Sequence, residues 1–285
     1  ITGHLIEPIG KGPFPAVVFN HSHGGTYEHG AAEVFHTAAE RPGVIPDAES
    51  PALAFVRRGY AVLAVDTYAF GARAGAGPKP DEVGNDGEHT LFKTFLWLGR
   101  SMWGMMVRDD LVALDWLCAQ PQIDATRIAA TGLSMGSTRS WWMAALDDRV
   151  HAMVGVCCLT RYTELVRAGA LWEHGMYYFV PGMLRHFDSE AVVALIAPRP
   201  CLMLNGARDG GSPAPGIRRI DRVVRRVYRL YGSPGSYRSI IYPGVGHTYT
   251  PEMWRETLAW LDAALRPVAP APARAHRKSG RARAR

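Results

Sequence analysis

A pentapeptide of the form Gly-x-Ser-x-Gly, residues 132–136, carries the strongest chemical signal in the sequence. It follows an apolar run and precedes a helix-forming stretch, so it predicts a sharp turn between a strand and a helix. Only glycines fit two residues on either side of the serine in such a turn, and the turn lifts the serine hydroxyl clear of the sheet. Ser134 is therefore the predicted nucleophile of an acyl-transfer reaction.

A serine nucleophile needs a base, and the base needs an acid that orients it. Where the serine lies on this kind of turn, the acid and then the histidine follow it, each in the loop after a later strand. Asp209 and His247 each come a few residues after a predicted strand. The carboxyl ends of parallel strands meet at one edge of a sheet, so we predict a triad of Ser134, Asp209 and His247. Asp188 is a weaker candidate for the acid, because the acid can lie in an earlier loop.

A third group of residues could bind the negative charge that develops during acyl transfer. Two glycines close the run His21–Gly25, which follows an early apolar strand, and they allow the backbone to approach a substrate. We expect the backbone N–H of His23 or Gly24 to join that of Met135 in an oxyanion hole. Met135 is the first residue of the predicted helix, where the helix dipole favours an anion.

The same stretch also supports a rival hypothesis, a metal site. His21 and His23 form a His-x-His pattern, and His29 and His36 lie nearby, but no Asp-x-His or Glu-x-x-His pattern follows them. We therefore favour the oxyanion hole, and we expect no metal and no other cofactor.

Alternating strands and helices must position these residues. Short apolar runs separated by longer amphipathic stretches predict a mostly parallel central sheet with helices on both faces. The predicted strands are 3–7, 15–20, 60–66, 127–132, 151–157, 199–204 and 237–242. The predicted helices are 106–120, 135–147 and 251–265, the last with Thr250 as its N-cap.

Three segments, 26–52, 67–105 and 158–192, are too long to be simple connections. Segments of this length are usually functional or contain helices of their own. The third is rich in large apolar side chains and predicts a helical, lid-like insertion. A further amphipathic surface helix is expected near 217–229, where arginines lie opposite apolar residues.

Composition limits the class of protein. A chain of 285 residues suits one α/β domain, which we place at 1–265. Residues 266–285 hold seven basic and no acidic side chains, and without them the formal net charge falls from +6 to −1. We expect this Pro/Ala/Arg-rich tail to be disordered and to have no specific nucleic-acid partner.

Other features leave the environment of the protein open. No stretch is apolar enough for a membrane span, so we expect a soluble protein. The four cysteines, Cys118, Cys157, Cys158 and Cys201, favour buried thiols over disulfides. The chain begins with Ile1, which suggests that an N-terminal segment has been removed or omitted. Compartment and oligomeric state cannot be predicted.

Several of these segments together resemble the branch of α/β-hydrolases that contains dienelactone hydrolases and acetyl xylan esterases. The resemblance covers most of 1–265 and rests on 14–18, 21–25, 59–62, 132–136, 197–200 and 246–247. It implies the α/β-hydrolase fold, the triad given above and the oxyanion hole at His23 and Met135. Dienelactone hydrolases have a cysteine as the nucleophile in this strand–helix turn. This chain has Ser134 at that position, which favours ester hydrolysis.

These observations predict a serine hydrolase that cleaves small-molecule carboxylic esters through an acyl-enzyme. Two alternatives remain open. The same triad would serve an exopeptidase or amidase, and the same scaffold could serve a binding protein without catalysis. The acyl and alcohol groups of the substrate cannot be read from the sequence.

Overall fold

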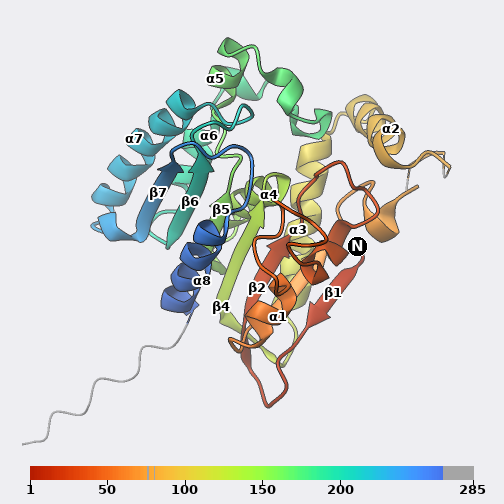
Figure 1. Cartoon of the computed structure of the whole chain (residues 1–285). Helices are drawn as coiled ribbons and strands as arrows, with labels where there is room; N and C mark the ends of the chain where they lie inside the picture. The colour runs from red at the N-terminus through yellow and green to blue at the C-terminus, as the bar shows by residue number, and fades with distance from the viewer. Residues whose placement is uncertain (76, 80, 266–285) are drawn as a thin grey trace, which may run out of the picture.

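The computed structural model describes residues 1–75, 77–79 and 81–265 of the chain. The predicted basic tail therefore lies outside the described residues. Seven strands form one sheet in the order β1-β3-β2-β4-β5-β6-β7 (Figure 1). β1 pairs antiparallel with β3, and every other pairing is parallel. The strands are β1 (Gly3–Ile6), β2 (Phe14–Asn20), β3 (Ala61–Val65), β4 (Ile123–Leu133), β5 (Val150–Val156), β6 (Cys201–Gly206) and β7 (Tyr237–Tyr242).

Helices connect these strands. The α-helices are α1 (Pro51–Val56), α2 (Gly84–Trp97), α3 (Met102–Cys118), α4 (Met135–Leu146), α5 (Tyr162–Arg167), α6 (Ser189–Ala194), α7 (Ala214–Leu230) and α8 (Pro251–Leu265). Short 3₁₀ turns are η1 (Gly30–Phe35), η2 (Gly71–Arg73), η3 (Leu171–Glu173), η4 (Met176–Tyr178), η5 (Met183–Arg185) and η6 (Pro234–Ser236). Among the described helices, none is long and apolar enough to cross a membrane.

Both faces of the sheet are covered by apolar side chains. On one face the strands pack against α3, α4, α6 and α7, with Leu114 and Trp141 among the buried residues. On the other face they pack against α1 and α8, where Phe55 meets Trp254. Strands buried on both sides need apolar residues at nearly every position, and β3 shows this along its whole length.

A third apolar cluster lies beyond the carboxyl edge of the sheet. It joins Phe70, Leu91 of α2 and Trp103 of α3 to Tyr177 and Tyr178 of η4. In Figure 1 the green segment that contains α5 lies above the sheet, and α2 lies beside it. We call residues 158–192, which contain α5 and the turns η3 to η5, the cap segment. Long connections thus carry short helices that pack together over the strand ends.

The structure confirms most predicted elements. All seven strands and the three predicted helices occur within a few residues of their expected limits, and the arginine-rich helix is α7. Its buried face is Ile217, Ile220, Val224 and Tyr228. The predicted N-cap is also present, because the Thr250 hydroxyl accepts a hydrogen bond from the Met253 N–H at 3.2 Å. The 14-residue helix α2 was missed, because its large apolar residues all lie in its second half and form no stripe along its length.

The turn between β4 and α4 crosses directly over the end of β2. Gly132 is paired with Asn20 across the sheet, and Gly136 lies against the same residue from the helix side. A Cβ atom at either glycine would overlap the Asn20 carbonyl oxygen. At Gly136 it would also lie 2.9 Å from the His21 carbonyl oxygen. Two segments that are distant in sequence are thereby held in backbone contact.

This contact can be tested by adding one methyl group. Gly136→Ala should lower the free energy of unfolding by about 2 kcal/mol or more, because overpacking costs roughly 1–3 kcal/mol and backbone cannot move aside cheaply. Helix propensity alone would favour alanine by about 1 kcal/mol, so the sign of the change is informative. The measurement is urea unfolding followed by circular dichroism.

Gly235→Ala is the matched control, since a Cβ at Gly235 meets no atom within 4 Å. Its free energy of unfolding should stay within about 0.5 kcal/mol of the parent, as is usual at the surface. Equal stabilities for the two variants would contradict the proposed backbone contact.

Candidate active site

Ser134 occupies the turn between β4 and α4 in a backbone conformation that side chains rarely adopt. Its φ is 60° and its ψ is −120°. The strain is held by the neighbouring strand, because the Ser134 N–H donates to the Val156 carbonyl at 2.9 Å. The Ser134 hydroxyl lies 3.7 Å from the Cys158 thiol, which follows β5. The predicted nucleophile is therefore presented at the carboxyl edge of the sheet.

Asp209 and His247 meet beside it. The imidazole Nδ1 lies 2.8 Å from Oδ2 of Asp209. The Asp209 side chain is 1% exposed and that of His247 is 42% exposed, so the carboxylate is enclosed while the ring reaches the surface. The loops after β6 and β7 bring the two residues together, because these parallel strands are neighbours that end side by side. A buried carboxylate on Nδ1 holds the ring in the tautomer whose Nε2 can accept a proton.

All three predicted residues line one small cavity of about 140 Å³. Its remaining walls come from the cap segment and from the loop after β6, which carries Asp209 and is called the acid loop below. The lining residues are Ser134, Cys158, Glu173, His174, Tyr177, Tyr178, Asp209, Gly211 and His247.

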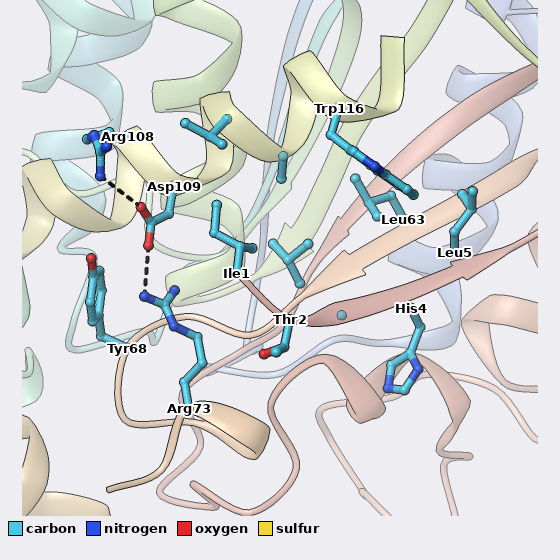
Figure 2. Close-up of a pocket in the computed structure, with 14 residues that line it drawn as sticks. Ile1, Thr2, His4, Leu5, Leu63, Tyr68, Arg73, Arg108, Asp109 and Trp116 are labelled. Carbon is cyan, nitrogen blue, oxygen red and sulfur yellow. Dashed lines mark ion pairs between the residues drawn. The ribbon is translucent and has the colours of Figure 1, made fainter. Parts of the chain in front are cut away.

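A larger cavity, about 630 Å³, lies beside the outermost strand, β1 (Figure 2). Its charged groups are already paired: Asp109 contacts Arg73 at 2.8 Å and Arg108 at 3.5 Å. Trp116 of α3 and Leu5 of β1 form its apolar part. It contains none of the predicted catalytic residues, so the smaller cavity is the better candidate for catalysis.

The loop after β2, predicted to form half of an oxyanion hole, is bound at Ser22 by a buried acid. Glu33 of η1 accepts hydrogen bonds from the Ser22 N–H at 2.8 Å and from the Ser22 hydroxyl at 2.6 Å. Arg41 lies 3.4 Å from the same carboxyl group. Burial raises the pKa of Glu33, and the hydrogen bonds from Ser22 and the charge of Arg41 oppose this rise.

A second buried acid binds the same loop at His23. Glu88 of α2 lies 2.9 Å from Nε2 of His23 and accepts a hydrogen bond from the Tyr27 hydroxyl at 3.3 Å. Burial, together with the nearby Glu88 charge, raises the pKa of Tyr27, so its hydroxyl stays a donor. The His23 ring also stacks on Tyr177, with ring centroids 5.2 Å apart. His23 thus contacts the cavity wall, although neither it nor Gly24 or Met135 is among the lining residues.

The rival metal hypothesis does not fit the contacts of the two histidines. Nδ1 of His21 lies 2.8 Å from the Ser22 carbonyl, and its Nε2 accepts from the Thr67 N–H at 3.2 Å. Burial holds the pKa of His21 well below its usual value, so the ring is neutral. His23 uses one nitrogen for Glu88 and the other for the Gly25 N–H. Neither ring has a free nitrogen for a metal ion.

Within the described part of the chain, one other group has metal-binding atom types: Cys157, Asp209 and His247 have ligand atoms within 4.8 Å of one another. Burial and the nearby Asp209 charge raise the pKa of Cys157 well above its usual value. A protonated thiol is a poor ligand, and the other two residues already bind each other. This group suits a hydrogen-bonded acid–histidine pair better than a metal centre.

Asp188, the weaker candidate acid, has a different position. It caps α6 and accepts hydrogen bonds from the N–H groups of Tyr162, Thr163 and Ser189 at 2.8–2.9 Å. Burial alone would raise the pKa of Asp188, but these hydrogen bonds and that of the Thr163 hydroxyl outweigh it and lower the pKa. The structure places Asp209, and not Asp188, against His247.

Sequence reasoning did not identify the residues that brace the site, chiefly Glu33, Glu88 and His174. Each is a polar residue of a long connection, with no motif around it that marks it as buried. Asp66 organises the turn after β3 by accepting from the Ala31 N–H at 2.7 Å and the Ala72 N–H at 3.2 Å, and Trp141 is part of the core.

Comparison with known proteins agrees with this geometry. Residues 5–257 match the model of the Abhydrolase family, Abhydrolase_7. The protein named "Putative hydrolase YtaP" of Bacillus subtilis is 36% identical over 253 residues, which is 88% of this chain and 79% of that protein.

Solved structures share the fold. A structure described as a putative acetyl xylan esterase from Bacteroides fragilis has a TM-score of 0.65 and 23% identity, over 90% of this chain and 69% of that one. A carbohydrate esterase family 15 glucuronoyl esterase from Caldicellulosiruptor kristjansonii has a TM-score of 0.61 and 18% identity, over 93% and 73%. The predicted resemblance is confirmed, and the chain belongs to the Abhydrolase family of α/β-hydrolases.

Proposed function

We propose that this chain is a serine-dependent carboxylic ester hydrolase. The observation that supports it most directly is the 2.8 Å pair of His247 and buried Asp209 in the same small cavity as the strained Ser134. The fold is shared with structures described as esterases, among them a glucuronoyl esterase and a methylesterase. These names suggest an ester as the substrate class.

In the proposed first step, the Ser134 hydroxyl turns from Cys158 toward His247 and attacks the ester carbonyl. His247 Nε2 takes the hydroxyl proton, and Asp209 stabilises the imidazolium that forms. The ester C–O bond then breaks, and the imidazolium gives its proton to the departing alcohol. The products of this step are a free alcohol and an acyl group on Ser134.

In the second step, His247 takes a proton from water, which attacks the acyl carbonyl. The bond between the acyl carbon and Ser134 Oγ then breaks, and the imidazolium returns its proton to Ser134 as the acid leaves. In both steps the carbonyl oxygen becomes negatively charged. Met135 is the first residue of α4, so its N–H is one of the donors that have no acceptor within the helix. We propose that this N–H and that of His23 or Gly24 stabilise the oxyanion.

The chemistry around the serine excludes Cys158 as an alternative nucleophile. Its thiol is buried, and burial together with the Asp209 charge raises its pKa to about 12. The thiolate is the reactive form of cysteine, so this thiol is inert at neutral pH. The thiol lines the cavity 3.7 Å from the Ser134 hydroxyl.

Ser134→Ala should abolish ester hydrolysis without unfolding the protein. The loss in rate is expected to be on the order of 10⁴- to 10⁶-fold, as for other triad nucleophiles. The measurement is hydrolysis of p-nitrophenyl esters from acetate to octanoate, with p-nitroanilides of the same acids to test amide cleavage.

Ser137→Ala is a matched control, because its buried hydroxyl lies in the same helix and has no hydrogen-bond partner. It should keep activity near that of the parent. Full activity in Ser134→Ala would disprove the proposed nucleophile, and faster cleavage of anilides than of esters would favour the amidase alternative.

The size of the cavity predicts a preference for short acyl groups. A space of about 140 Å³, closed by the buried rings of Tyr177 and Tyr178, leaves little room beyond a few carbon atoms. We expect kcat/KM to be highest for acetate or butyrate and to fall toward octanoate.

Cys158→Gly should shift this preference toward longer acyl groups. It removes the thiol from the cavity wall and suits the φ of 50° at this position, which glycine adopts readily. Cys118→Ala, on the far side of the molecule from this cavity, is the control. The same ranking of esters in both variants would show that the wall at Cys158 does not limit the acyl group.

A further inference from the structure

One buried histidine of the cap segment, His174, contacts the loop that carries Asp209. His174 is 8% exposed, and its Nε2 lies 2.7 Å from the Gly211 carbonyl oxygen. A carbonyl oxygen can only accept, so Nε2 must carry the proton and donate it. Burial lowers the pKa of His174, which keeps the ring neutral, and the Gly211 carbonyl selects the tautomer with the proton on Nε2. The cap segment and the acid loop are therefore joined by a directed hydrogen bond.

Gly211 also binds the acid of the predicted triad. Its N–H donates to Oδ1 of Asp209 at 3.0 Å, while Oδ2 of Asp209 binds His247. One carboxylate oxygen is thus held by the loop backbone and the other by the imidazole. Gly211 therefore links the two contacts: its carbonyl accepts from His174, and its N–H donates to the acid that binds His247.

The approach of His174 to this loop depends on close packing. A Cβ at Gly211 would lie 3.4 Å from His174 Nε2, which is an ordinary van der Waals distance, so the ring lies directly against this residue. The ring is held on its other side by Tyr178, with centroids 4.8 Å apart. Thr160, also in the cap segment, donates to the same Gly211 carbonyl at 2.7 Å. Two donors from one insertion therefore converge on a single backbone atom.

We propose that His174 is a positioning residue, which acts through Gly211 to hold Asp209 in the orientation that His247 requires. The inference rests on the proposed function, because it assigns the cap segment a part in that reaction. It makes this insertion a support of the triad as well as a wall of the cavity.

Three variants separate this role from simple packing. His174→Phe keeps the ring size but removes the donor, and His174→Gln keeps an N–H donor at nearly the same distance from the backbone. His186→Phe changes an exposed histidine of the same insertion and is the matched control. Thermal unfolding of each variant shows whether it folds. If the phenylalanine variant does not fold, Thr160→Val carries the test, because it removes the second donor to the Gly211 carbonyl and should also lower kcat and shift the NMR signal described below.

For p-nitrophenyl acetate, His174→Phe should lower kcat by about 10- to 100-fold, the range that a misplacement of about 1 Å causes, with little change in KM. His174→Gln should recover most of kcat, and His186→Phe should match the parent.

A measurement without substrate keeps this test independent of the esterase proposal. The proton between His247 and Asp209 gives a low-field proton NMR signal, which Asp209→Asn identifies by abolishing it. This signal should shift in His174→Phe and return toward its parent position in His174→Gln. If the parent hydrolyses no ester but the signal behaves in this way, the proposed function fails and the positioning role stands.

Two results would overturn the positioning role. One is an unchanged NMR signal and kcat in a folded His174→Phe variant. The other is a raised KM at constant kcat, which would mean that His174 only shapes the cavity.

Discussion

The backbone contact between the serine turn and the end of β2 is the constraint on which the rest of the site depends. Gly132 and Gly136 lie against the Asn20 carbonyl so closely that neither position has room for a Cβ atom. Asn20 is the last residue of β2, and the loop that follows it begins at His21. Fixing the turn against Asn20 therefore fixes the distance from the Ser134 hydroxyl to that loop. The strained backbone of Ser134 persists because sheet pairing and this contact hold it on both sides.

Around this fixed point, three long connections each supply a buried polar side chain to one loop of the site. Glu33 holds Ser22, Glu88 holds His23, and His174 holds Gly211. Loops on their own are mobile, and a catalytic group that moves by a fraction of an ångström loses much of its effect. Hydrogen bonds to the backbone or side chains of each loop limit that motion. The insertions thus brace the site as well as enclosing it.

Burying these polar groups has a cost that the structure offsets with paired partners. Burial raises the pKa of Glu33, which shows that the charged form is disfavoured there, and Ser22 and Arg41 compensate in part. His174 stays neutral because burial lowers its pKa, so it carries no buried charge, although its Nδ1 has no hydrogen-bond partner among the described residues. Such groups stabilise the fold only weakly, but they define one arrangement of the loops, since any other would leave a buried donor or acceptor without a partner.

The sequence by itself determined the order of strands and helices and placed a serine on a sharp turn, and it predicted His247 as the base with two candidate acids, Asp209 favoured over Asp188. These features depend on local patterns: apolar runs, the glycines at 132 and 136, and the short distance from a strand end to Asp209 or His247. Only the tertiary structure decided between Asp209 and Asp188 as the partner of His247, and only it revealed Glu33, Glu88 and His174 as braces. Their partners lie 11 to 65 residues away, and burial of a polar side chain in a long connection leaves no periodic signal in the sequence. Local preference decides which elements form, whereas contacts between distant elements decide which polar groups meet.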